Sequence, residues 1–146
     1  MRIAIAASLL LFAGFAQAKN CVIDVKGDDQ MKFDKASVTV SAACKTIEIK
    51  LMHTGKLPIT AMGHNLVISP TADFQAVGQA GMTAGAAANY VPTGDKRVIA
   101  HTKVVGGGGS TTASFPGSAL KAGGDYTFYC SFPGHWAIMK GKLIVE

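Results

Sequence analysis

The sequence has no apolar run long enough to cross a membrane as a helix. Its longest uncharged apolar stretch, residues 3–15, is shorter than the roughly 20 residues that a spanning helix needs. That stretch follows Met1-Arg2 and precedes Ala16-Gln17-Ala18, the pattern of an export signal cleaved after Ala18. We therefore expect residues 1–18 to be a signal peptide and the mature chain to have no membrane span.

Charged residues are also sparse, at 16% of the chain, and they form no basic run. The formal net charge is +5, and removal of Arg2 with the signal leaves +4, because no other charge precedes Lys19. The lysines are scattered without interleaved aromatic residues, which argues against nucleic-acid binding. A moderately basic surface does allow docking to an acidic partner. Residues 19–146 suit a single domain with a core of its own.

Cysteine occurs only three times, and an odd number in an exported protein requires an explanation. Cys21 and Cys44 flank the first two predicted strands, where a disulfide would close a moderate loop and stabilise the fold by about 3 kcal/mol. Cys130 is then a free thiol. The rival pairing, with Cys130 in the disulfide and one N-terminal cysteine free, stays open on the cysteine count alone.

Short stretches that alternate apolar and polar residues dominate the rest of the chain. Gly, Pro or Asp separates most of them, which is typical of an all-β sandwich. The predicted strands cover residues 21–26, 38–42, 47–51, 65–69, 97–102, 111–115, 126–130 and 142–146. One short inserted helix is expected within residues 71–88, which are rich in Ala, Gly, Gln and Met, although the glycines weaken it.

One loop collects three side chains that bind soft metal ions. Cys130, His135 and Met139 lie between a predicted strand and the last strand. A thiolate, an imidazole and a thioether suit copper in both oxidation states, and two histidines with one cysteine and a long axial methionine form a blue copper site. His64 would supply the missing histidine from a second loop. Gly63 beside it would let the backbone come close to the metal.

With these residues the sequence resembles the azurins of the cupredoxin family. The likeness rests on Gly63-His64-Asn65 and on the spacing Cys130-x4-His135-x3-Met139, and it covers essentially the whole mature chain. It implies a Greek-key sandwich with one copper bound by His64, Cys130 and His135 in a plane, and with Met139 and the Gly63 carbonyl on the axis. Asn65 and the backbone around Ser131 and Phe132 would supply hydrogen bonds that tune the thiolate.

The resemblance also implies an apolar patch around His135, where redox partners such as cytochromes or reductases would dock briefly. Electrons would pass through His135. Two departures affect the shape of this surface: Leu66 stands where some azurins bury a tryptophan, and the single tryptophan, Trp136, follows His135. The patch would comprise Met31, Leu57, Met62, Met82, Phe132, Pro133, Ala137 and Ile138, of which the three methionines could instead be ordinary core residues.

Two histidines outside the ligand set have other interpretations. His53 continues the alternation of the strand at residues 47–51 and is therefore expected in the core. By analogy with azurins, we hypothesise that its protonation shifts the reduction potential, which equal potentials at about pH 5 and pH 8 would exclude. His101 is expected at the surface.

The sequence thus predicts a monomeric electron carrier of a bacterial periplasm rather than an enzyme. A copper oxidase or reductase domain usually needs further histidines beside the copper cysteine, but Tyr129 and Ser131 occupy those places. A catalytic thiol at Cys130 is disfavoured because no nucleophile signature surrounds it. Copper storage or delivery in the cell envelope is the alternative function, and zinc could occupy the same ligands.

Overall fold

A computed structural model describes residues 19–146, and the predicted signal peptide at residues 1–18 lies outside this range. Among the helices of residues 19–146, none has the length and apolar character needed to traverse a bilayer.

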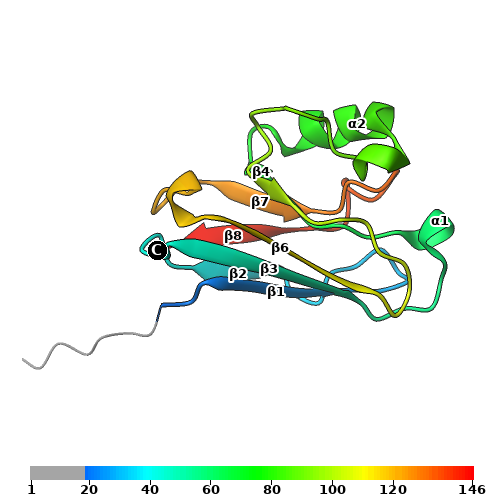
Figure 1. The fold of residues 1–146 in the computed structure, drawn as a ribbon, viewed down its shortest axis with the longest axis horizontal. Helices are drawn as coiled ribbons and strands as arrows, with labels where there is room; N and C mark the ends of the chain where they lie inside the picture. Colours follow the sequence, from blue (N-terminus) through cyan, green and yellow to red (C-terminus); the bar gives the residue numbers. More distant parts are fainter. Residues whose placement is uncertain (1–18) are drawn as a thin grey trace, which may run out of the picture.

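Two β-sheets pack face to face, as the alternating pattern predicts, and form a Greek-key sandwich (Figure 1). One sheet has the strand order β1-β3-β6 and the other β2-β8-β7-β4-β5. Strands β1 and β3 are parallel, as are β2 and β8, and the other neighbours are antiparallel. The strand bounds are β1 Val22–Gly27, β2 Ser37–Val40, β3 Thr46–His53, β4 Val67–Pro70, β5 Ala100–His101, β6 Ser110–Pro116, β7 Tyr126–Tyr129 and β8 Lys140–Val145.

The main core lies between the sheets and contains the inward-facing residues of each strand. In β3, Ile47, Ile49 and Leu51 are at most 1% exposed, whereas Lys50 faces solvent. Strand β7 is buried on both faces, because the helix α2 (Phe74–Ala84) covers the outer side of the β4–β7 pair (Figure 1). A second, smaller core therefore forms under the helix, built on Val67, Val77, Val91 and Tyr129.

The strand predicted at residues 97–102 is too long, since β5 contains only Ala100–His101. Arg97 instead turns back on Asp95: its backbone N–H and its Nε both donate to Asp95 Oδ1 at 3.0 Å, and Nη2 donates to Oδ2 at 2.6 Å. These bonds from Arg97 lower the pKa of Asp95 to about 2. The local ion pair thus holds this segment in a turn and delays the start of the strand.

The structure also contains a helix that the sequence pattern does not predict. Helix α1 (Ile59–Met62) is one turn that starts after Pro58, a residue that favours a helix start. Its apolar residues show no helical periodicity over so few positions. The helix predicted within residues 71–88 is confirmed as α2, and single 3₁₀ turns follow at Ala86–Ala88 and Gly117–Ala119.

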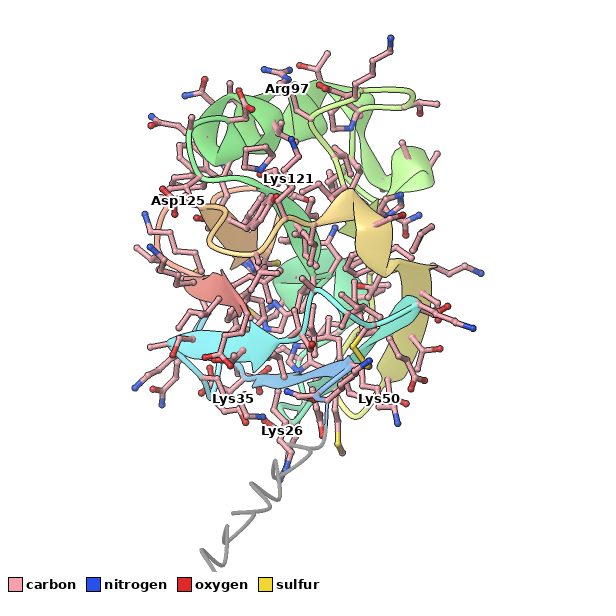
Figure 2. The ribbon with its side chains drawn as sticks, turned by 90° about the vertical axis from the view of Figure 1, so that its left-hand side faces the viewer. Lys26, Lys35, Lys50, Arg97, Lys121 and Asp125 are labelled. Carbon is pink, nitrogen blue, oxygen red and sulfur yellow. A yellow bond between two sulfur atoms is a disulfide. The ribbon has the colours of Figure 1, made fainter. Side chains whose placement is uncertain are left out.

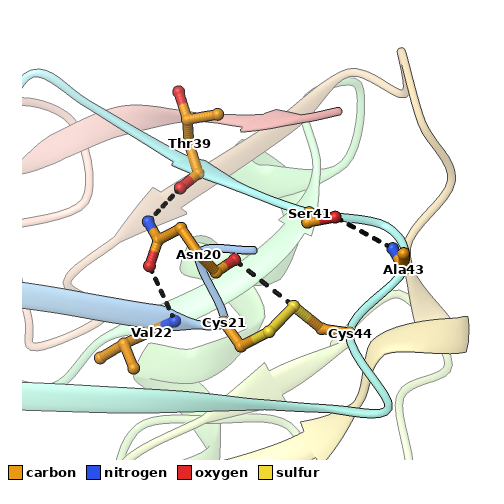
Figure 3. The surroundings of a disulfide bond; sticks show 7 residues. All are labelled: Asn20, Cys21, Val22, Thr39, Ser41, Ala43 and Cys44. Atoms are coloured by element: carbon orange, nitrogen blue, oxygen red, sulfur yellow. Dashed lines mark hydrogen bonds between the residues drawn. A yellow bond between two sulfur atoms is a disulfide. The ribbon is translucent and has the colours of Figure 1, made fainter. Parts of the chain in front are cut away.

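The predicted disulfide joins Cys21 to Cys44 with a Cα–Cα distance of 5.7 Å, and Cys130 is free and buried. Figure 3 shows how Asn20 reinforces this corner: its side chain donates to the Thr39 carbonyl and accepts from the Val22 amide. The bridge lies where β1 and β3 begin. Figure 1 places that end of the sandwich opposite α1, so the disulfide is remote from the ligand loops.

Exposed charges are spread over the surface, as the sequence predicts. Figure 2 looks at the end of the sandwich opposite α1 and shows Lys26, Lys35, Lys50 and Lys121 on different segments. Three of the ion pairs, such as Lys142 with Asp125, involve exposed side chains and contribute little to stability.

Candidate metal centre

Three potential ligand atoms converge at the α1 end of the sandwich. The Sγ of Cys130 lies 3.5 Å from Nδ1 of His135 and 3.8 Å from Nδ1 of His64, and the three atoms lie within 4.8 Å of one another. Bonds of about 2.0 and 2.3 Å meeting at about 120° would separate a nitrogen and a sulfur by roughly 3.7 Å. The spacing of the donors therefore fits one trigonal metal ion.

His64 is held with its Nδ1 free for a metal. Its backbone pairs with Val105 through two hydrogen bonds, N to O at 2.9 Å and O to N at 2.8 Å. Its Nε2 lies 2.7 Å from the Asp28 carbonyl, which can only accept. The proton of the neutral ring therefore sits on Nε2, and Nδ1 presents its lone pair towards Cys130.

Cys130 is fully buried at the end of β7. Desolvation raises the pKa of its thiol to about 12, although backbone N–H groups of Asn65 and Phe132 point at the sulfur and partly oppose that rise. The Gly63 carbonyl oxygen lies 3.8 Å from the same sulfur. A cation at this point would stabilise the thiolate, and the two amides are already placed to receive its charge.

His135 is presented by a compact loop between β7 and β8. Its N–H donates to the Phe132 carbonyl at 2.9 Å, and its carbonyl accepts from the Met139 amide at 2.8 Å. Gly134 before it has φ of +82°, a conformation that favours glycine, and forms the exposed apex. The loop closes where the Cys130 amide donates to the Met139 carbonyl at 3.0 Å. Two predicted ligands are thus fixed to each other through the backbone.

Gly27 is a site residue that the sequence analysis missed. A Cβ atom there would lie 2.8 Å from Cδ2 of His64 and 2.8 Å from Cε of Met139, so the space for both side chains depends on a glycine. Met139 is 1% exposed and thus packs beside His64, consistent with its predicted axial place. A glycine at the end of a strand carries no signal of this role, because the contacts cross from one sheet to the other.

Gly63 provides space next to the ligand loop, and its predicted approach to the metal stays a prediction. Its φ of −68° and ψ of 141° are open to any residue, so conformational freedom is not what it provides. A Cβ atom there would instead lie 2.6 Å from Val104 Cγ1 and 2.8 Å from Phe132 Cδ2. The glycine is required for room between α1 and the ligand loop.

Asn65 joins the two ligand loops by side-chain hydrogen bonds. Its Nδ2 donates to Ser131 Oγ and to the Asn89 carbonyl, both at 2.8 Å, and its Oδ1 accepts from the Ser131 amide at 2.8 Å. All of Asn65 and Ser131 is buried. Because these residues follow His64 and Cys130 directly, the network holds both ligands in register.

The remaining histidines lie where the sequence predicts. His53 is buried and stacks on His64, with ring centroids 4.2 Å apart, while its Nε2 lies 2.8 Å from the Met62 carbonyl and its Nδ1 accepts from the Gly55 amide. His101 is exposed. The proposed effect of His53 on the reduction potential stays a prediction.

The residues predicted to form a docking patch are unequally exposed. Leu57, Met82 and Ile138 are 41%, 47% and 62% exposed, whereas Phe132 is 8% exposed and supports the surface from below. Met31 and Met62 are half-buried, and Pro133 and Ala137 are exposed. The sequence analysis missed Ile59 of α1, which is 46% exposed and borders an apolar hollow of about 170 Å³ beside Phe132.

Comparison with known proteins agrees with this geometry. Residues 19–146 match the family described as copper binding proteins, plastocyanin/azurin family. The chain belongs to that family. Among plastocyanin/azurin relatives, it is 51% identical to an azurin of Bordetella pertussis over 94% of this chain and 91% of the relative. It is 52% identical to an azurin of Alcaligenes faecalis over 84% of this chain and 96% of the relative.

A solved azurin structure, Az-iso2 from Methylomonas sp. strain J, superposes with a TM-score of 0.82 at 42% identity and covers 86% of this chain and 98% of the other. Membership of the plastocyanin/azurin family, with the His64, Cys130 and His135 cluster, confirms the predictions of a copper cofactor and of a blue copper electron carrier, a class distinct from enzymes.

Copper binding is expected to release about one proton per chain at neutral pH. The metal binds thiolate, but burial raises the pKa of the Cys130 thiol to about 12, so the metal-free chain retains that proton. Both imidazoles are neutral at this pH, because burial lowers the pKa of His64 and takes that of His135 to about 4. The apparent affinity should therefore rise about tenfold per pH unit between about pH 7 and pH 9.

A titration with Cu(II) in dilute buffer containing a pH indicator measures this release. The variant Cys130→Ser serves as the control and should release no proton, since a serine hydroxyl does not ionise in this range. Two protons released by the unaltered chain would mean that a histidine also loses one.

Proposed function

We propose that the chain is a periplasmic one-electron carrier in which His64, Cys130, His135 and Met139 hold one copper ion, with the Gly63 carbonyl as a weak axial donor. The observation that carries the proposal is the convergence of one thiol and two imidazoles, within 4.8 Å, on a buried point. Copper there supplies the cycling between Cu(I) and Cu(II) by which one electron is taken up and given back.

The residues of this chain keep the ligand positions fixed in both oxidation states. The Asp28 carbonyl orients His64, and the backbone amides of Asn65 and Phe132 face the sulfur of Cys130. The Asn65 side chain ties the loop of His64 to the loop of Cys130 through Ser131. A site arranged by the protein before the metal binds needs little rearrangement when an electron arrives, which suits a carrier.

Electrons enter and leave through His135. It is 3% exposed and belongs to the loop in which Pro133 and Ala137 are exposed, whereas Cys130 has no exposed surface. The exposed apolar residues Leu57, Met82 and Ile138 give a partner a surface that it can contact and leave quickly. Partners are redox proteins such as cytochromes or reductases.

The partner's contact surface is acidic around its rim. Three exposed lysines at this end directly adjoin predicted patch or ligand-loop residues in the chain: Lys32, Lys56 and Lys140. A fourth, Lys103, directly precedes Val104, which lines the apolar hollow beside Phe132. The acidic residues nearby are Asp28 and Asp29, both half-buried, and their carboxylates accept hydrogen bonds from backbone amides. A partner therefore meets a positive rim around an apolar centre.

Reversing one of these charges should slow electron transfer to an acidic partner. With Lys56→Glu or Lys103→Glu, we expect the second-order rate constant with an acidic soluble cytochrome c to fall about threefold to tenfold at low salt. The difference should vanish at high ionic strength because the charges are exposed. Stopped-flow mixing measures the rate constant at several salt concentrations.

The matched controls are Lys45→Glu and Lys121→Glu, which change the net charge equally. Lys45 directly precedes β3, which starts at the end opposite α1 in Figure 1, and Lys121 is labelled at that end in Figure 2. Equal slowing by all four variants would show that total charge, rather than the rim, governs the rate.

The periplasm is the proposed location, and one monomeric domain at residues 19–146 is the proposed mature form. The Cys21–Cys44 disulfide supports this, because such bonds persist in oxidising compartments. The export pattern at residues 1–18 agrees with it. A monomer fits this function because a stable dimer formed through the apolar patch would cover the surface that partners must contact.

Copper reconstitution tests the function. Mature protein loaded with Cu(II) should bind one ion per chain, show an intense blue thiolate-to-copper band with narrow copper hyperfine splitting, and keep its copper through repeated one-electron reduction and oxidation. Release of the ion on each reduction would favour the storage or delivery alternative. A pale, inert sample would exclude the carrier.

A further inference from the structure

Helix α2 contains two buried glycines, although glycine destabilises a helix relative to alanine. Gly78 and Gly81 lie three residues apart and therefore share one face. A Cβ atom at Gly81 would lie 2.1 Å from the Tyr90 carbonyl oxygen. A Cβ atom at Gly78 would lie 2.7 Å from Cγ and 3.0 Å from Cβ of Trp136, the stem of that side chain rather than its mobile end. Gly78 thus leaves a groove that Trp136 of the ligand loop fills, and Gly81 leaves room for the Tyr90 carbonyl.

Trp136 lies in this groove among aromatic neighbours. Its ring meets the Phe74 ring edge-on at 6.5 Å, and Phe74 meets Tyr129 edge-on at 5.8 Å. Phe74 lies one helical turn before Gly78, and the Nζ of Lys140 sits 4.7 Å above its ring. Edge-on aromatic pairs and a cation over a ring are both favourable arrangements. The cluster therefore fixes Trp136 against the helix.

The position of Trp136 in the chain gives this contact a consequence for the metal site. Trp136 directly follows His135, and Tyr129 directly precedes Cys130. The His135 ring is directed towards the sulfur of Cys130, while the next side chain is directed towards α2. On its other side, His135 follows Gly134, whose φ of +82° marks a flexible residue type at the exposed apex. Trp136 is thus the side-chain anchor next to His135, the ligand beside the exposed apex of the loop.

We propose that Trp136, seated in the groove at Gly78, is a positioning residue that sets the orientation of His135 towards the metal. The inference rests on the proposed copper function and deepens it. Helix α2, which touches no ligand atom, becomes the support of the ligand loop. Displacing the tryptophan from the groove would turn His135, weaken copper binding and alter the spectrum.

The variant Gly78→Val tests this by filling the groove. We expect the Cu(II) affinity, measured by competition with a chelator, to fall about tenfold, as is typical when a residue that orients a metal ligand is lost. The copper hyperfine splitting should change. In the copper-free protein, the fluorescence of Trp136, the single tryptophan of the chain, should shift to the red as the ring moves into water.

Gln79→Val is the matched control, because it places the same β-branched residue on the same helix at an exposed position. It should leave the Cu(II) affinity, the copper hyperfine splitting and the tryptophan emission unchanged. If Gly78→Val does not fold by circular dichroism, Gly78→Ala takes its place with smaller shifts in the same directions.

The decisive variant combines Gly78→Val with Trp136→Ser. A smaller side chain at position 136 leaves room for the valine, so affinity and hyperfine splitting should return towards those of Trp136→Ser alone. The inference would be overturned if the loss of copper affinity in the double variant equalled the sum of the losses in the two single variants, because independent sites are additive. A Gly78→Val protein with displaced tryptophan emission and an unchanged copper spectrum would also overturn it. A parent protein without a blue band would instead remove the proposed function.

Discussion

Replacing Cys130 by serine is expected to abolish the intense visible absorption of the copper-loaded protein. That absorption requires a thiolate sulfur bonded to copper, and Cys130 is the free cysteine of the described chain. A serine hydroxyl stays protonated near neutral pH and is a harder, weaker ligand for copper. Absorption and electron paramagnetic resonance should show a complete loss of the blue band and a wider hyperfine splitting, even if some copper remains on the histidines.

The double variant Cys21→Ala with Cys44→Ala is the matched control for this experiment. It removes two sulfurs at the other end of the sandwich and should keep the blue band. Its free energy of unfolding should fall by about 3 kcal/mol, because the bridge closes a loop of 23 residues. A pale control protein that is still folded would show that the disulfide region shapes the copper site.

The sequence predicts the ligand end of the molecule well because its chemistry is carried by side chains. Cys130 ends one strand, His135 follows on the same loop, and His64 precedes the neighbouring strand β4. Adjacent antiparallel strands in one sheet bring the end of one to the start of the next. The alternation of Ile47, Ile49 and Leu51 likewise predicts which residues fill the core.

The sequence pattern does not reveal two parts of the site: a contact made by a backbone carbonyl, and a space left by the absence of a side chain. Asp28 orients His64 with its carbonyl, which every residue possesses, and it acts across 36 residues of sequence. Gly27 contributes only the space that a side chain would fill. Neither role changes the residue pattern, because the first depends on the pairing of distant loops and the second on packing between the two sheets.

The glycines of α2 are a second case in which the sequence pattern alone does not explain a residue. Judged by helix propensity alone, Gly78 and Gly81 weaken the predicted helix. The structure explains them by the approach of Trp136 and of the Tyr90 carbonyl. Tertiary contact thus outweighs local preference at the point where the helix meets the ligand loop. Family membership identifies the metal, but only the packing indicates how this chain supports His135.

Replacing Asn65 by leucine, which has a similar shape, is expected to destabilise the copper-free protein by about 4 kcal/mol. Three hydrogen bonds of 2.8 Å disappear, and the amide and the hydroxyl of the buried Ser131 lose partners that water cannot replace. Each stranded buried group costs about 1–3 kcal/mol. Urea unfolding measures the change as a lower midpoint with an unaltered slope.

Asn20→Leu provides the matched control for that loss, because Asn20 also makes side-chain hydrogen bonds to two backbone groups but is exposed. Water replaces those bonds, so the control should lose less than about 1 kcal/mol. The Asn65→Leu protein should also show a changed copper spectrum, since Ser131 directly follows Cys130 and would no longer be tied to the His64 loop. Equal destabilisation by the two substitutions, with an unchanged spectrum, would mean that Asn65 neither strengthens the fold through burial nor holds the two ligand loops together.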